Sequence, residues 1–214
     1  MESTLIGKAL KYAKALFEND SSGHDYFHTL RVCKTALTLA EAEHADPLVT
    51  GLAAALHDAD DRKLSPETTK TKANARAFLR ENGVDPQTEE RILTAIGEVS
   101  YRGTDSVTPS TIEGKCVQDA DRLDAIGAVG IARAFAYGGA HHRPMHDPAV
   151  PPEKNMDATR YYAHEATTVN HFYEKLLKLK ELMNTAAARR MAEERDRYMR
   201  AFLEEFYAEW DGQR

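Results

Sequence analysis

Residues 24–58 read HDYFHTLRVCKTALTLAEAEHADPLVTGLAAALHD, and the spacing of their apolar side chains predicts two consecutive helices. The first is expected from about Tyr26 to Glu43, because apolar residues recur there at the three- and four-residue intervals that place side chains on one helix face. Asp46 followed by Pro47 indicates the start of the second helix, since aspartate caps free amide groups and proline fits the first turn. This second helix ends at His57-Asp58.

The rest of the chain has the same helical periodicity and no convincing strand alternation. Start and stop signals predict further helices over residues 1–20, 66–82, from residue 86 onward, over 118–137, and over 160–210 with a break near 183–185. Residues 101–110 and 141–158 lack this periodicity and are expected to be loops. The second loop holds four prolines and is either a flap over a site or a flexible linker. The sequence therefore predicts one all-α domain over residues 1–214.

Composition places the chain among ordinary soluble proteins, with 42% hydrophobic and 29% charged residues. No window approaches the run of about 18 apolar residues that a membrane span needs, and the N-terminus has no apolar signal core, so we expect a cytoplasmic protein without a membrane partner. A net charge of −6 argues against a broad nucleic-acid surface. Cys33 and Cys116 form no paired motif and are expected to be buried free thiols.

Two polar clusters interrupt otherwise apolar helices. His57 and Asp58 end the second helix, where a buried polar pair is costly unless it is bound to something. Asp119, Asp121 and Asp124 lie within six residues at the start of a strongly apolar segment. Each residue alone has a simpler explanation, because Asp119 suits a helix cap and Asp124 suits an ion pair with Arg122, Arg133 or a lysine.

Together with His28, these side chains make a mixed nitrogen and oxygen donor set. Such a set suits Mn²⁺, Fe²⁺, Co²⁺, Ni²⁺ or Zn²⁺, whereas Mg²⁺ is less natural beside two histidines. His24 lies one turn before His28, so both could share a face of a helix. It either contacts a substrate or a water, or simply neighbours the start of the helix.

Four segments, in order, carry a family resemblance: HDYFHTLRV, LHDADDRK, QDADRLDAIGAVGIARAFAYGG and HFYEKLLKLKELMNT. They resemble the H…HD…D signature of the HD-domain metal-dependent phosphohydrolases, and in particular a bacterial nucleotide (pyro)phosphohydrolase-like subgroup of similar length. The resemblance implies a single helical HD-domain bundle with a long loop over the metal site. It also implies one divalent ion, Mn²⁺ in the first place, held by His28, His57, Asp58 and Asp121.

The same resemblance implies an activity. We expect hydrolysis of nucleoside or deoxynucleoside triphosphates, as a pyrophosphohydrolase, by metal-activated water. A nucleotide monophosphatase or phosphodiesterase would use the same site, and a di-metal oxygenase would need further ligands, for which His24 and Asp61 are the candidates. The expected partner is a small phosphorylated molecule such as a nucleotide, and a homodimer is compatible with the sequence.

Several other polar residues are candidates for catalysis or substrate binding. Asp61 lies one helical turn from His57 and Asp58, so it could orient a water or move its proton, unless it is only a solvated charge. Lys63 is expected to act on the reacting phosphate. Candidate substrate contacts, mostly cations suited to phosphate oxygens, are His24, Arg31, Arg122, Arg143, His171 and Lys175. Arg31 could instead brace an acidic ligand, and residues 138–152 are expected to form a mobile margin of the pocket.

Overall fold

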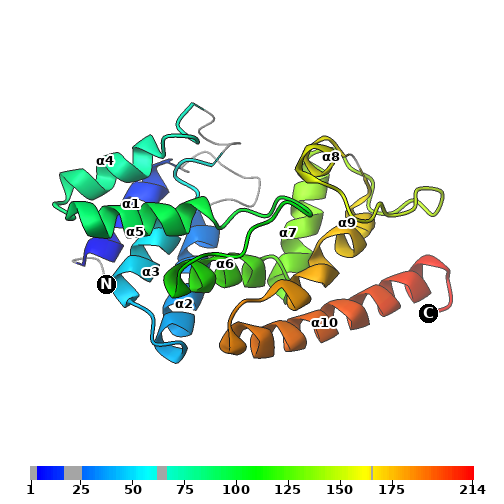
Figure 1. The fold of residues 1–214 in the computed structure, drawn as a ribbon. Coiled ribbons are helices and arrows are strands. Elements are labelled where there is room, and N and C mark those ends of the chain that lie inside the picture. The colour runs from blue at the N-terminus through cyan, green and yellow to red at the C-terminus, as the bar shows by residue number, and fades with distance from the viewer. Residues whose placement is uncertain (1–3, 17–25, 62–66, 165) are drawn as a thin grey trace. The chain divides into compact units, whose positions relative to one another are not determined.

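The computed structural model describes residues 4–16, 26–61, 67–164 and 166–214. Its regular elements are all helices, and one isolated bridge between Arg102 and Thr104 is the nearest approach to a strand in these ranges (Figure 1). The predicted all-α class is confirmed. Contacts divide the chain into two compact units, residues 1–101 with 106–121, and residues 102–105 with 122–214. The single domain expected over residues 1–214 stays a prediction, because compactness alone does not define a unit that folds independently.

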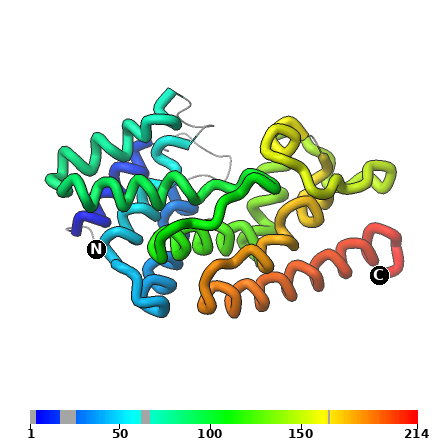
Figure 2. Tube along the Cα trace, viewed as in Figure 1, coloured from blue at the N-terminus to red at the C-terminus, as the bar shows by residue number. Residues whose placement is uncertain are grey.

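The first unit is built around helix α3 (Pro47–Leu56). This helix packs against α1 (Leu5–Leu16), α2 (Tyr26–Ala42) and α5 (Pro86–Gly97), while α4 (Ala73–Glu81) packs against α5 (Figures 1 and 2). Small side chains let the neighbours approach α3 closely. A Cβ atom on Gly51 would lie 2.4 Å from Ile6 Cδ1, so a larger residue there would require the Ile6 side chain to move.

Local capping confirms two of the predicted helix starts. Asp46 Oδ1 accepts hydrogen bonds from the amides of Leu48 and Val49 at 2.9 and 3.2 Å and caps α3. Asp85 caps α5 in the same way, through the amides of residues 87 and 88 at 3.1 and 3.0 Å. These bonds satisfy amides that have no partner within their own helix.

The helix expected over residues 66–82 begins later than predicted. Ser65 and Pro66, which gave the start signal, lie outside the described residues. Residues 67–72 form turns, and α4 begins at Ala73. Lys72 has a φ of 51°, a left-handed conformation that cannot belong to a right-handed helix, so the helix starts only after it. The predicted end is confirmed, with Gly83 at a φ of 72° directly after Asn82.

The helix predicted over residues 118–137 is wrong, because the structure has two helices there. Helix α6 (Ile112–Asp124) ends before Ile126, which is extended, and α7 (Gly127–Ala140) begins at Gly127 with a φ of 76°. An apolar period continues across this break, which is why periodicity alone did not show it. The division between the compact units also falls within α6.

The second unit contains α7, α8 (Ala158–Ala163), α9 (Thr168–Glu174), the 3₁₀ helix η1 (Leu176–Leu182) and α10 (Ala186–Trp210). Helix α10 packs against α7 and η1, and α9 packs against both of these as well. In this unit the fully buried ring of Phe172 lies beside the half-buried rings of Phe135 and Phe202. The break predicted near residues 183–185 is confirmed, since Thr185 caps α10 by accepting the amide of Ala188 at 3.2 Å. The continuous helix expected from residue 160 to this break is wrong, because α8, α9 and η1 are separate elements there.

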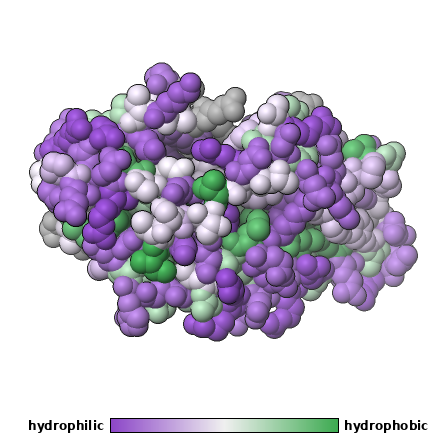
Figure 3. Space-filling view, viewed as in Figure 1, coloured by the Kyte–Doolittle hydropathy of each residue, from purple (hydrophilic) through white to green (hydrophobic). Residues whose placement is uncertain are grey.

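The surface of the molecule is mainly hydrophilic in the view of Figure 3. Exposed large apolar side chains, such as Phe27, Val129 and Tyr198, come from different helices, as is normal for a folded protein. In the part of the chain that the structure describes, no helix is both long and apolar enough to cross a bilayer. Cys33 and Cys116 are buried free thiols, as predicted.

Candidate metal centre

Two histidines and an aspartate of the first unit bring their donor atoms together. His28 lies in the first turn of α2 and is fully buried, as are Thr29 and Val32 beside it. His57 is the C-terminal cap of α3, and Asp58 follows it in a turn. Both are 8% exposed. A fully buried histidine beside a buried aspartate is costly unless the group is satisfied by a bond or by a ligand.

The turn after α3 is held by its own backbone. The amide of Ala59 donates to the carbonyl of Leu56, and the amide of Asp61 donates to the carbonyl of Asp58, both at 3.0 Å. His57 Nδ1 lies 2.8 Å from the carbonyl oxygen of Ala54. Because a carbonyl oxygen only accepts, Nδ1 carries the proton, and Nε2 is left with its lone pair toward the cluster.

The distances between the donor atoms suit a shared ion. His28 Nε2 and His57 Nε2 lie 3.4 and 3.3 Å from the same oxygen, Oδ2 of Asp58. Ligand atoms that are each about 2.1 Å from one ion lie roughly 3 to 4 Å apart. These three residues form a group that could hold a metal ion.

Asp121 on α6 brings a fourth donor to the same place. Its Oδ1 lies 3.5 Å from His28 Nε2 and 4.0 Å from His57 Nε2, and its side chain is 28% exposed. His57 Nε2 is buried and makes no hydrogen bond within the described residues. A buried imidazole nitrogen aimed at two carboxylates is the arrangement expected of a metal ligand. The residues present therefore fit a divalent cation.

The two neighbouring aspartates have other surroundings. Asp124 pairs with Arg133 at 2.7 Å, which confirms the ion pair considered from the sequence. Asp119 is fully buried within α6. Neither belongs to the His–His–Asp group found among the described residues.

The structure gives Asp60 a role as a helix cap that was not predicted from the sequence. Its Oδ1 and Oδ2 accept the amides of Asn74 and Ala75, each at 3.0 Å, and it is 5% exposed. Asp60 thus caps α4 from a distant part of the chain. The run DADD is typical of a solvated charge cluster, and no local pattern links it to a helix that starts at Ala73.

The remaining predicted residues of the first unit are only partly described. His24 and Lys63 lie outside the described residues. Asp61 is half-buried at the end of the turn after α3, and Arg31 is half-buried on α2, one turn after His28. As a catalytic residue and a phosphate contact, respectively, Asp61 and Arg31 stay predictions.

Four predicted substrate contacts belong to the second unit. Arg122 is 5% exposed and donates to the carbonyl of Leu182, a contact that favours a structural role. The Arg143 guanidinium lies 5.4 Å from the ring centre of Tyr137. Lys175 Nζ lies 5.8 Å from the ring centre of Tyr161, and His171 is half-buried on α9. As substrate contacts these four stay predictions.

The segment after α7 is tied to the start of α9. The amides of Thr168 and Val169 donate to the carbonyls of Pro144 and Met145 at 3.0 and 2.9 Å. Further along, Asn170 Nδ2 donates to the carbonyl of Val150 at 2.8 Å. The expected mobility of residues 138–152, and their place over the metal site, stay predictions.

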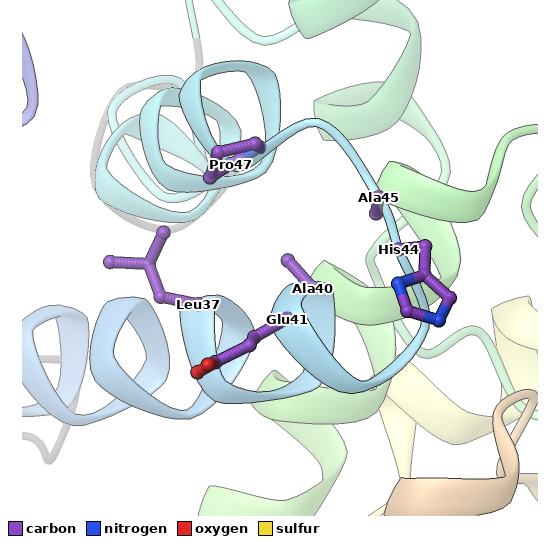
Figure 4. Close-up of a pocket in the computed structure, with 6 residues that line it drawn as sticks. All are labelled: Leu37, Ala40, Glu41, His44, Ala45 and Pro47. Atoms are coloured by element: carbon purple, nitrogen blue, oxygen red, sulfur yellow. The ribbon is translucent and has the colours of Figure 1, made fainter.

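A shallow hollow elsewhere in the first unit contains no predicted site residue. It lies where α2 connects to α3, and Figure 4 shows the side chains that line it: Leu37, Ala40, Glu41, His44, Ala45 and Pro47. One carboxylate and one exposed histidine among apolar side chains do not form a convergent donor set. Within the described residues, the group whose donor atoms converge closely enough to hold a metal ion is the one formed by His28, His57 and Asp58.

Comparison with protein families finds a match to the HD domain over residues 25–126. This range contains the two histidines and both aspartates of the cluster, and it ends just before α7. The second compact unit lies almost entirely beyond it.

Whole-chain relatives are also found. The Bacillus subtilis protein YpgQ is 38% identical over 194 residues, which cover 90% of this chain and 87% of YpgQ. A crystal structure of YpgQ in complex with ADP superposes with a TM-score of 0.75, covering 95% of this chain and 97% of that one at 31% identity in the structural alignment. A Bacillus thuringiensis HD-superfamily hydrolase is 43% identical, with a TM-score of 0.74 and 96% of each chain covered. A Lactobacillus plantarum protein reaches a TM-score of 0.86 at 36% identity over 99% of each chain.

Proposed function

This chain belongs to the HD domain family, and from that premise we propose that it is a divalent-metal-dependent phosphohydrolase that splits nucleoside or deoxynucleoside triphosphates into a monophosphate and pyrophosphate. That it is an HD-superfamily hydrolase follows from the family; the substrate and the bond cleaved are the proposal. The observation that carries it is the convergence of His28 Nε2, His57 Nε2, Asp58 Oδ2 and Asp121 Oδ1.

These four side chains would hold the ion, with Mn²⁺ as the first candidate and Fe²⁺, Co²⁺, Ni²⁺, Zn²⁺ or Mg²⁺ as alternatives. Two imidazoles and two carboxylates neutralise a divalent charge and leave coordination positions for water and a phosphate oxygen. When bound, the ion supplies a more acidic water and a polarised phosphoryl group.

The chain's own residues would handle the proton and the phosphate charge. Asp61 would take a proton from the attacking water, whose oxygen forms a bond to the α-phosphorus. The bond from that phosphorus to the bridging oxygen breaks, and pyrophosphate leaves. Lys63 and Arg31 would meet phosphate oxygens, as cations near a transferring phosphoryl group do.

A nucleotide substrate is supported by the relative that was crystallised with ADP. ADP carries the base, the sugar and two phosphates, so a nucleotide-binding relative favours a nucleotide for this chain as well. The monophosphatase and phosphodiesterase alternatives would keep the same donor atoms and change only the leaving group.

The proposal is tested with purified protein, Mn²⁺ and a panel of ribo- and deoxyribonucleotides, with separate detection of phosphate and pyrophosphate. Pyrophosphate release from triphosphates is expected. Release of phosphate from monophosphates would favour the monophosphatase instead, and no turnover of any nucleotide would overturn the proposal.

The metal assignment is tested in the same preparation. His57→Ala and Asp121→Ala should each reduce the bound Mn²⁺ far below the wild-type content, because each removes a donor. Asp211→Ala, which removes an exposed carboxylate at the end of α10, is the control and should bind Mn²⁺ normally. Full occupancy in both ligand variants would reject these ligands.

A further inference from the structure

We propose that Asp60 is a positioning residue, which holds the turn bearing His57 and Asp58 against the start of α4 and thereby sets the affinity for the metal. The inference rests on the proposed metal site. Three hydrogen bonds carry it, and we call them the Asp60–Asn74 clamp. The amides of Asn74 and Ala75 donate to Asp60 Oδ1 and Oδ2 at 3.0 Å each, and Asn74 Nδ2 donates to the carbonyl of Ala59 at 2.8 Å.

Helix α4 depends on this clamp because it has no cap of its own. Its N-cap residue, Lys72, is left-handed and makes no capping bond through its side chain. The first amides of a helix have no partner within the helix, and the positive end of its dipole favours a carboxylate. Asp60 supplies that carboxylate, and its buried position is satisfied because both oxygens accept amides.

The clamp also fixes the geometry of the metal-binding turn. Asp60 is two residues after Asp58 and directly before Asp61, and the amide of Asp61 donates to the carbonyl of Asp58. A rotation of the turn would therefore move the carboxylates of both Asp58 and Asp61. Asp58 Oδ2 lies 3.4 Å from His28 Nε2 and 3.3 Å from His57 Nε2. Even a small displacement of Asp58 would therefore separate the donor atoms.

A helix can be capped by the residue directly before it, as Asp46 caps α3 and Asp85 caps α5. Capping alone therefore does not require an aspartate in the turn after α3. Helix α4 instead takes its cap from the turn that carries two of the four metal donors. Removal of a partner that orients metal ligands typically lowers metal affinity by about 10- to 100-fold. The clamp predicts such a loss without the removal of any ligand.

The experiment compares Asp60→Ala and Asn74→Ala with Asp85→Ala. Asp85 caps α5 through two amides, as Asp60 caps α4, but it belongs to no metal-binding turn. Mn²⁺ affinity is measured by the electron paramagnetic resonance signal of the free ion, at a temperature at which circular dichroism shows each variant folded. Asp60→Ala should lose about 10-fold or more in Mn²⁺ affinity, and Asn74→Ala should lose less. Asp85→Ala should keep wild-type affinity although its Tm falls.

Three results would overturn the positioning role of Asp60. If Asp60→Ala binds Mn²⁺ as tightly as Asp85→Ala does, Asp60 is only a helix cap and the inference is overturned. If Asp60→Ala does not fold, Asn74→Ala decides, and wild-type affinity in that variant overturns the inference. If the wild type and Asp85→Ala also bind no Mn²⁺, the proposed metal site fails, and the positioning role fails with it.

Discussion

His57 uses its two ring nitrogens differently, and this difference makes it suitable as a ligand. Nδ1 is held by the carbonyl of Ala54 at 2.8 Å, one turn back on α3. That bond fixes the tautomer and the ring orientation, so Nε2 keeps its lone pair toward Asp58 and Asp121. The sequence places His57 at the end of an apolar helix, but the structure is needed to show that the carbonyl of Ala54 is the partner of Nδ1.

Asp61 provides a test of the proposed chemistry at the scale of one side chain. Asp61→Asn removes the proton acceptor and keeps the side-chain size, so kcat should fall by about 10²- to 10⁴-fold. The Mn²⁺ content should stay normal, because Asp61 is not among the four donors. Steady-state kinetics and metal analysis of the same sample check this. Wild-type turnover in Asp61→Asn would show that the residue is only a surface charge.

The two cysteines give a prediction about pH. Burial raises the pKa of the Cys33 thiol to about 11, and burial together with the nearby carboxylate of Asp119 raises the pKa of Cys116 to about 12. The pKa of a thiol in an unfolded chain is about 8.5. The folded pKa values are the higher ones, so the stabilisation by neutral thiols is complete below the unfolded value and is lost as the pH rises toward 11 to 12.

We therefore expect both thiols to react slowly with a disulfide reagent at pH 8 in the folded protein and rapidly in denaturant. The Cys33→Ala and Cys116→Ala variants, examined separately, assign each reaction. Rapid labelling of either thiol in the folded protein at pH 8 would contradict the burial that the structure shows.

At the scale of elements, the junction between α6 and α7 depends on one glycine. Gly127 has a φ of 76°, and a Cβ atom there would lie 3.0 Å from Arg195 Cγ. Gly127→Ala should therefore lower the free energy of unfolding by about 1 to 2 kcal/mol. Gly139, also in α7, is the matched control, because a Cβ atom added there would have no heavy atom within 4 Å and its φ is not positive.

Gly139→Ala should raise the free energy of unfolding by about 0.4 to 1 kcal/mol, because alanine restricts the unfolded chain and suits a helix. Denaturant unfolding of both variants gives the comparison. Equal effects of the two substitutions would show that the left-handed conformation of Gly127 does not determine the break.

The segment after α7 carries the prediction for Arg143. If this side chain meets the polyphosphate, Arg143→Ala should raise the KM for a triphosphate more than that for a phosphodiester of lower charge, with Mn²⁺ binding unchanged. Arg190→Ala, on the exposed side of α10, is the control for loss of one positive charge. The same KM change for both substrates would exclude a specific role in binding the polyphosphate.

For the whole molecule, the metal should act as a cross-link between segments that are far apart in the chain. The donors come from α2, from the turn after α3 and from α6, so an ion that binds only the folded protein stabilises all three. At about 100 times its Kd, Mn²⁺ should add about 2.7 kcal/mol and raise the Tm by roughly 5 to 10 °C.

Thermal unfolding with and without Mn²⁺ measures this effect, and His57→Ala is the variant in which it should disappear. Mg²⁺ at the same concentration should give a smaller shift, since two imidazoles suit it less well. An equal Tm increase in wild type and His57→Ala would mean that Mn²⁺ stabilises the protein elsewhere.

Much of the fold could be predicted because its signals are local. Asp46-Pro47 and Asp85-Pro86 start helices through bonds that span two or three residues, and Gly83 ends one through its own backbone conformation. Other boundaries could not be predicted in this way. The start of α4 depends on Asp60, and the break before Gly127 lies inside a continuous apolar period.

The helical class, the buried thiols and the types of donor available for a metal could all be predicted from the residues alone, since periodicity, burial preference and ligand chemistry are properties of the side chains. Which atoms meet depends on the packing of the helices. Packing of α2 on α3 brings His28 and His57 to the same carboxylate oxygen, and α6 adds Asp121. The same packing makes Asp60 the cap of α4, because a contact between residues distant in the chain depends on how the helices are arranged and not on any local pattern.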